Sequence, residues 1–127
     1  MTIGFDNLAA YNQDLLLCLR FREGIGTETH DWAKPHHSMT LHGLPIWQSL
    51  ANELVVMDYD ANNPDWLDCT AAVSDDLDFT AADFSVSAWV YLDDIANFRM
   101  VMCRGNIWPG GGWMFYVAPT GYVGLMT

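Results

Sequence analysis

Hydrophobic and polar residues alternate most regularly between Asp83 and Tyr91. One face of this stretch carries the apolar residues Phe84, Val86, Ala88 and Val90. The other face carries Ser85, Ser87, Trp89 and Tyr91. A period of two over eight or more residues predicts a β-strand. We therefore expect a strand here, with its apolar face buried between two sheets.

Shorter apolar segments predict further strands. They lie at residues 15–21, 39–41, 54–57, 99–103, 113–117 and 122–126, and residues 45–50 fit either a short helix or a strand. Gly105 and the glycines at 110–112 mark the connection of a hairpin. Several short strands, separated by Gly and Pro turns and without a long amphipathic helix, indicate an all-β protein, an antiparallel β-sandwich or barrel.

The order of these segments resembles a known family. Residues 16–27 read as an apolar strand followed by Glu-Gly-Ile-Gly-Thr, residues 54–58 as a strand that ends in Asp, and residues 77–90 as Asp-Phe-Thr leading to Ser-Ala-Trp-Val. This pattern is similar to laminin-G-like (LamG) domains of the concanavalin A-like lectin/glucanase superfamily. The resemblance implies a jelly-roll β-sandwich over residues 14–127, preceded by an N-terminal arm at 1–13.

Domains of this family usually continue beyond the strand that corresponds to residues 122–126. The resemblance therefore implies a sandwich that is incomplete at its C-terminus. An edge left open in this way invites pairing with another strand. We expect that a continuation of the polypeptide or a strand from a neighbouring chain completes it.

The charge of the chain narrows the range of partners. Sixteen acidic residues against five basic ones give a formal net charge of −11. This balance argues against nucleic acid and anionic membrane surfaces, which select basic patches, and fits a cation, a neutral sugar or a basic protein face. No apolar run approaches the roughly 20 residues of a membrane-spanning helix. The N-terminus lacks the features of a signal peptide, and the location of the protein stays open.

The three cysteines are an odd, widely spaced set. Cys18 and Cys103 sit inside apolar, strand-like runs, so we expect reduced thiols in the core, and the spacing indicates neither a disulfide framework nor a zinc site. The histidines at 30, 36, 37 and 42, with Asp31, match no closed metal site, and polar loop histidines are the simpler interpretation.

Oxygen-bearing residues recur at every second position after residue 57. Asp58, Asp60 and Asn62, with Asp65, resemble the start of a calcium loop but lack the glycine and glutamate of an EF-hand. A Ca²⁺ site of another kind is one hypothesis, and a solvated turn rich in Asp and Asn is the other.

Aromatic residues offer a second kind of site. Trp32, Tyr59, Trp66 and Trp108 are candidate ligand contacts because a flat, solvated ring is a platform for a sugar, although packing against the sandwich also accounts for each ring. Trp32, Trp66 and Trp108 are expected in loops.

These features favour a non-catalytic binding or adhesion module that recognises a glycan or a protein surface through loops. The first alternative is a structural component of a larger assembly, such as a phage virion surface or tail protein, which contacts copies of itself or other virion proteins. The second is a fragment of a glycoside-active enzyme. We expect no enzymatic activity, because the paired carboxylates of glucanases and a Gly-x-Ser-x-Gly elbow are missing from the sequence.

Overall fold

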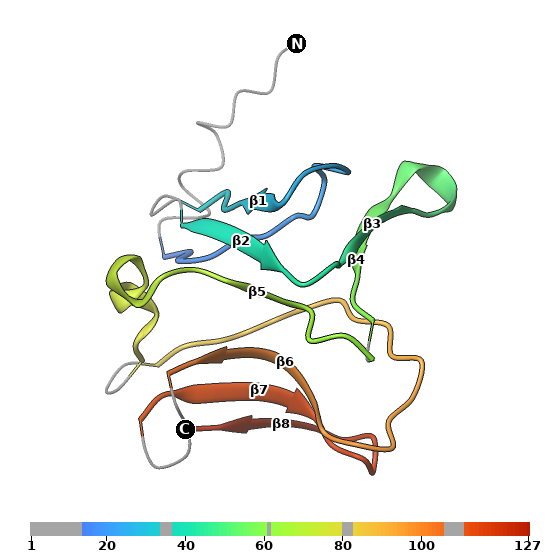
Figure 1. Ribbon diagram of the computed structural model, residues 1–127. Coiled ribbons are helices and arrows are strands. Elements are labelled where there is room, and N and C mark those ends of the chain that lie inside the picture. Colours follow the sequence, from blue (N-terminus) through green and yellow to red (C-terminus); the bar gives the residue numbers. More distant parts are fainter. Residues whose placement is uncertain (1–13, 34–36, 61, 80–82, 106–110) are drawn as a thin grey trace. The chain divides into compact units, whose positions relative to one another are not determined.

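The computed structural model describes residues 14–33, 37–60, 62–79, 83–105 and 111–127. The chain divides into two compact units, Met1–Ser74 and Asp75–Thr127. The described parts of both units consist of short antiparallel strands and 3-10 turns, without an α-helix (Figure 1). The all-β prediction is therefore confirmed, and each unit is treated below by itself.

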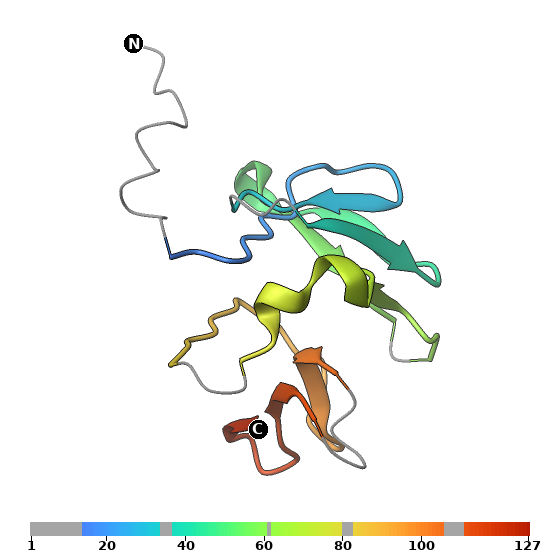
Figure 2. The same ribbon diagram turned by 90° about the vertical axis from the view of Figure 1, so that its left-hand side faces the viewer.

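The first unit contains two antiparallel sheets. Strands β1 (Glu28–His30), β2 (Ser38–His42) and β5 (Trp66–Asp68) pair in the order β1-β2-β5 (Figures 1 and 2). Strand β3 (Ile46–Ser49) pairs with β4 (Val55–Asp58) across the turn η2 (Ala51–Glu53), and the turn η3 (Ala71–Val73) follows β5. The segment between residues 22 and 43 thus contains two paired strands, β1 and β2.

The core of the first unit lies on one face of the three-stranded sheet. Thr29 of β1 and Met39 and Leu41 of β2 are buried, while their neighbours along each strand point outward. This alternation follows from the pleat of a strand, which sends successive side chains to opposite faces. The outward face is therefore free to carry polar residues.

The second unit is a three-stranded antiparallel sheet with an aromatic core. It begins with the turn η4 (Asp75–Leu77) and pairs β6 (Arg99–Arg104), β7 (Trp113–Val117) and β8 (Val123–Met126) in that order. Trp113 is buried, with its ring centroid 5.6 Å from that of Phe79 and 5.7 Å from that of Phe84. Its indole N–H donates to the Leu77 carbonyl at 2.8 Å, which satisfies the polar atom of the buried ring.

Most of the predicted strands are confirmed. The segments at 39–41, 54–57, 99–103, 113–117 and 122–126 correspond to β2, β4, β6, β7 and β8, and the ambiguous segment at 45–50 contains the strand β3. The predicted hairpin between β6 and β7 is also confirmed, with Arg104 opposite Trp113. The predicted arm at 1–13 lies outside the described residues.

The predicted strand at residues 15–21 is wrong. This segment is half-buried and forms a single bridge, between Leu19 and Asp31. Phe21 has φ 50, a left-handed conformation that interrupts an extended strand. The apolar run is therefore half-buried without joining a ladder.

The predicted strand at residues 83–91 is also wrong as a paired element. The segment runs without a turn or bend but pairs with no strand of the described chain (Figure 1). Phe84 and Val86 are half-buried, whereas Ala88 and Val90 are exposed, so the expected burial of all four fails. The period-two pattern identified an extended segment, but burial between sheets needs a partner strand that the described residues do not supply.

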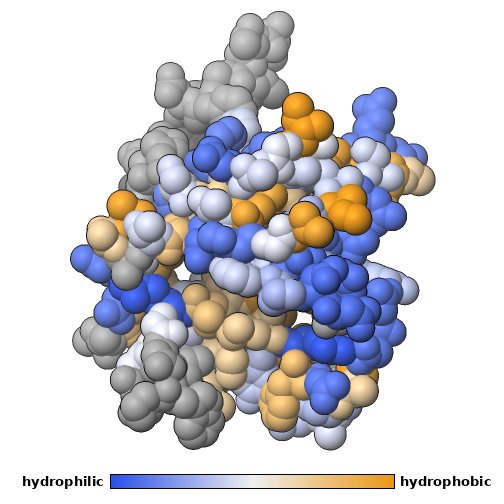
Figure 3. All heavy atoms as spheres, in the orientation of Figure 1, coloured by the Kyte–Doolittle hydropathy of each residue, from blue (hydrophilic) through white to orange (hydrophobic). Residues whose placement is uncertain are grey.

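The surface mixes apolar and polar residues. On the face shown in Figure 3, hydrophobic residues are interspersed with hydrophilic ones. Among the described residues, no helix is long and apolar enough to cross a membrane. All three thiols are free, as expected, but Cys103 is exposed, because a register shift between Met100 and Met102 changes which residues of β6 point inward.

Candidate binding face

The outward face of the sheet β1-β2-β5 is polar. Cross-strand pairing sets Glu28 of β1 and Asp68 of β5 on either side of Thr40 in β2. Two residues further along β2, His42 lies opposite Trp66. The strands thus bring together residues that lie far apart in the sequence.

Three side chains at the β5 edge form what we call the Trp66 cluster: His42, Trp66 and Asp68. The two rings stack, with centroids 4.8 Å apart and planes 11° apart. His42 Nε2 lies 2.9 Å from Asp68 Oδ1, and Trp66 Nε1 donates to Asp68 Oδ2 at 3.3 Å. An ionised carboxylate only accepts, so His42 carries a proton on Nε2 in this arrangement. One carboxylate therefore fixes the orientation of both rings, while Trp66 stays 47% exposed.

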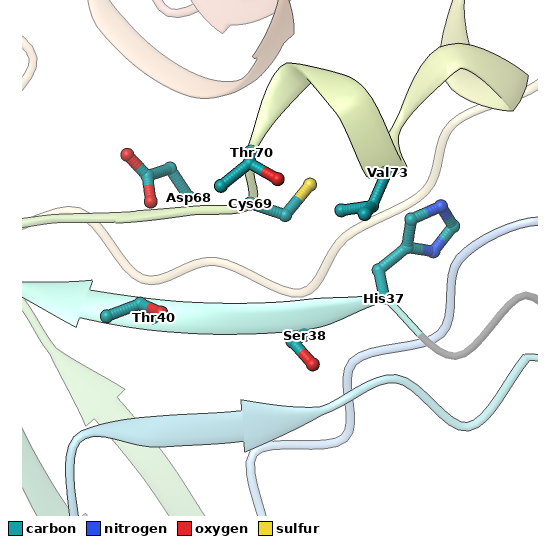
Figure 4. A pocket seen from close by; sticks show the side chains of 7 residues that line it. All are labelled: His37, Ser38, Thr40, Asp68, Cys69, Thr70 and Val73. Carbon is teal, nitrogen blue, oxygen red and sulfur yellow. The ribbon is translucent and has the colours of Figure 1, made fainter.

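A hollow of about 320 Å³ opens beside this cluster (Figure 4). It is lined by residues of β2, by the residue that precedes β2, and by the segment that runs from β5 through η3: His37, Ser38, Thr40, Asp68, Cys69, Thr70 and Val73. Three hydroxyl groups and a carboxylate border it, and Asp68 belongs to both the hollow and the Trp66 cluster. The volume lies at the lower end of the range for small-ligand pockets.

A buried Asp–His pair supports one wall of the hollow. Asp31 Oδ2 accepts from the Nδ1–H of His37 at 2.7 Å, and the backbone N–H groups of Cys18 and Ala33 donate to Oδ1 at 2.8 Å each. Burial alone would raise the pKa of the Asp31 carboxyl, but these hydrogen bonds hold the pKa below its usual value. The carboxylate thereby ties three separate parts of the chain together and positions His37 at the hollow.

The aromatic candidates have separate surroundings. Trp32 is exposed and has the Arg20 guanidinium 4.9 Å from its ring centroid. Burial and the negative charge of Asp65 raise the pKa of Tyr59 to about 12. Trp66 belongs to strand β5, which corrects its expected place in a loop. Trp108 lies outside the described residues.

The calcium candidates form a hydrogen-bonded turn. Asp58 ends β4. Asp60 Oδ1 accepts from the backbone N–H of Asn62 at 2.8 Å, and Asp65 accepts from the N–H groups of Asp60 and Leu44 at 3.1 and 2.8 Å. These bonds give Asp60 and Asp65 a structural role. The calcium hypothesis stays a prediction, and a melting-temperature shift in millimolar calcium tests it.

The histidines do not form a metal site within the described chain. No group of three or more His, Cys, Asp or Glu residues there is placed to hold an ion. His37 is buried against Asp31, His42 belongs to the Trp66 cluster, and His30 flanks Ser38 on the polar face. His36 lies outside the described residues.

Sequence reasoning singled out Trp66 as a candidate ligand contact but not the two residues that pack and bond with it. His42 was read as a polar loop histidine, and Asp68 was not singled out. The pair lies 26 residues apart in the chain, and only the register of β2 with β5 reveals it. No local pattern in the sequence carries that information.

No known protein family, curated protein or solved structure matches this chain.

Proposed function

We propose that the protein is a non-catalytic binding module that recognises a glycan at the Trp66 cluster and the adjoining hollow. The observation that carries the proposal is the stacked pair of His42 and Trp66, held by one carboxylate on an exposed, polar face. A ring that is already fixed loses little conformational freedom when a ligand stacks on it. The site is therefore preorganised.

The chemistry around the ring suits a polyhydroxyl ligand. The hydroxyl groups of Ser38, Thr40 and Thr70 donate and accept hydrogen bonds, as sugar hydroxyls do. The apolar face of a pyranose ring matches the solvated indole, and its rim of hydroxyls matches the polar hollow.

The charges favour a neutral or cationic glycan over an anionic one. Asp68 and Glu28 flank the face, and the whole chain carries a formal charge of −11. Carboxylated and sulfated sugars would approach against this field. The three antiparallel sheets are consistent with a β-sandwich, and the concanavalin A-like, laminin-G-like jelly roll remains part of the proposal.

A glycan array followed by calorimetry tests the proposal. Neutral glycans should bind to the full chain, and Trp66→Ala should weaken the selected ligand about tenfold or more, because a stacked aromatic contact contributes on the order of 1 kcal/mol beyond its buried area. Trp66→Phe, which keeps a flat ring, should lose less affinity for the ligand than Trp66→Ala.

Tyr122→Ala is the matched control, because Tyr122 is an exposed aromatic residue of the second unit. The Tyr122→Ala protein should bind the selected glycan with the same affinity as the unmodified chain. An array without a neutral ligand, or a Trp66→Ala protein that binds as well as the unmodified chain, would refute glycan recognition at this cluster.

A further inference from the structure

Residues 83–92 present an open backbone. No N–H or C=O group of this segment is hydrogen-bonded to any other part of the described chain. The segment is nevertheless free of turns and bends over its whole length. An extended, unpaired run of this kind is a template for another strand.

The segment is anchored at one end and exposed at the other. The Phe84 ring stacks on Phe79 at 4.3 Å between centroids and contacts Trp113, which fixes the start of the segment to the core of the second unit. Beyond it, Trp89 is fully exposed and Tyr91 is 90% exposed. Two large aromatic side chains thus lie in solvent beside backbone N–H and C=O groups that have no hydrogen-bond partner in the described chain.

The sequence of the segment is complementary to itself. In an antiparallel pair of two copies centred on Ser87, apolar residues oppose apolar ones: Phe84 opposes Val90, and Val86 opposes Ala88. On the other face Ser85 opposes Trp89. Asp83, the only charged residue of 83–91, lies opposite Tyr91, so no like charges meet directly.

We infer that residues 83–91 pair with the same residues of a second copy of the chain, in an antiparallel register centred on Ser87. The pairing satisfies the backbone groups on the facing edge of each copy and brings Trp89 and Tyr91 into cross-strand contacts. A contact of this kind, in which one patch meets itself, forms a closed two-fold dimer rather than a filament.

The net charge shapes how this dimer responds to salt. Two chains of formal charge −11 repel each other, while the paired segments hold together through hydrogen bonds and apolar contacts. Screening shortens the Debye length from roughly 14 Å at 50 mM salt to about 4–5 Å at 500 mM. The dimer should therefore tighten as salt rises.

Sedimentation velocity of the full chain, across concentration and at both salt levels, measures the dimer directly. In this register the two Ser87 residues form a hydrogen-bonded pair. Ser87→Pro removes the donor at the centre of both strands, and we expect the dimer dissociation constant to rise at least about tenfold. Ser87→Thr keeps the donor and favours a strand, and it should leave the dimer as tight or tighter. Circular dichroism of each variant confirms that the exposed substitution leaves the fold intact.

A pair of charged variants separates self-pairing from pairing with a different chain. At a two-fold axis any charge faces itself, so Ser87→Asp and Ser87→Lys should both weaken the dimer. Opposite responses to the two charges would indicate a different partner strand. That result would overturn the inference. So would a monomer at all concentrations, a dimer whose dissociation constant does not change in Ser87→Pro, or a dimer that salt weakens.

Discussion

At the scale of single residues, the buried carboxylate of Asp31 connects separate segments of the first unit. Its side chain is fully buried, and its two oxygens accept from Cys18, Ala33 and His37. A buried carboxylate is favourable only when it is paired and hydrogen-bonded, because the loss of hydration is large. The hollow that His37 lines therefore depends on the Asp31 carboxylate.

Asp31→Asn should destabilise the protein by about 1–3 kcal/mol, the usual cost of leaving a buried hydrogen-bonding group without its partner. The amide places a donor where the carboxylate accepted, and it leaves the N–H groups around it poorly satisfied. Denaturant unfolding measures the change. Asp75→Asn is the control, because Asp75 is an exposed partner of Arg104, and it should cost less than about 1 kcal/mol. Equal losses for the two variants would contradict the structural role of Asp31.

The pH dependence of stability should report the same carboxylate. Its folded-state pKa lies below the ordinary value of 3.8, so its contribution is complete above that value and is lost as the pH falls through the folded-state pKa. The free energy of unfolding should drop on acidification below pH 3.8. The drop should be shallower in Asp31→Asn, which has no carboxyl at this position. Parallel pH curves for the two proteins would exclude Asp31 as the cause.

At the scale of elements, the hairpin β3–β4 has a strained turn. Asn52 and Glu53 both adopt left-handed φ values, of 66 and 61, and Leu50 N–H donates to the Leu54 carbonyl at 2.7 Å to close the turn. Asparagine tolerates this conformation, whereas a glutamate side chain opposes it by about 1 kcal/mol.

Glu53→Gly should therefore raise the free energy of unfolding by about 0.5–1 kcal/mol, because glycine adopts a positive φ without strain. The same substitution at Glu28, the first residue of strand β1, should lower it, since glycine is disfavoured in strands. Thermal unfolding of the two variants measures both changes. A destabilised Glu53→Gly protein would show that the turn is not strained by its side chain.

Strands were predictable where the local sequence carries a clear hydrophobic pattern with turn residues at its ends. Strands β6, β7 and β8 were predicted because apolar runs bounded by Gly and Pro mark them. The three-residue strands β1 and β5 were missed, because Glu28–His30 and Trp66–Asp68 are too short to show a period. Their pairing with β2 depends on long-range contacts. The Trp66 cluster was invisible for the same reason.

At the scale of the whole molecule, the division into two units was not foreseen. The alternating segment at 83–91 suggested one sandwich with one core, whereas burial gathers around Met39 and Leu41 in the first unit and around Trp113 in the second. Sequence patterns indicate which face of a strand turns inward, but not which strands share a core. That choice rests on packing between distant segments.

The two units should lose their structure separately. Trp113→Ala removes the ring that packs on Phe79 and Phe84 and the hydrogen bond to Leu77, and it should cost the second unit about 3–5 kcal/mol. Each unit has its own buried residues, so the damage should stay within residues 75–127. Hydrogen exchange measures this, because protection reports local opening segment by segment.

In Trp113→Ala, amides of β6, β7 and β8 should exchange faster, while the amides that donate to Asp31 keep their protection. Asp31→Asn should give the reverse pattern, with fast exchange around Ala33 and His37 and an unchanged second unit. The reciprocal pair is informative because general destabilisation by one variant would accelerate exchange in both units. If each substitution accelerates exchange in both units equally, the chain unfolds as a single cooperative unit, and the two groups of buried residues stabilise each other.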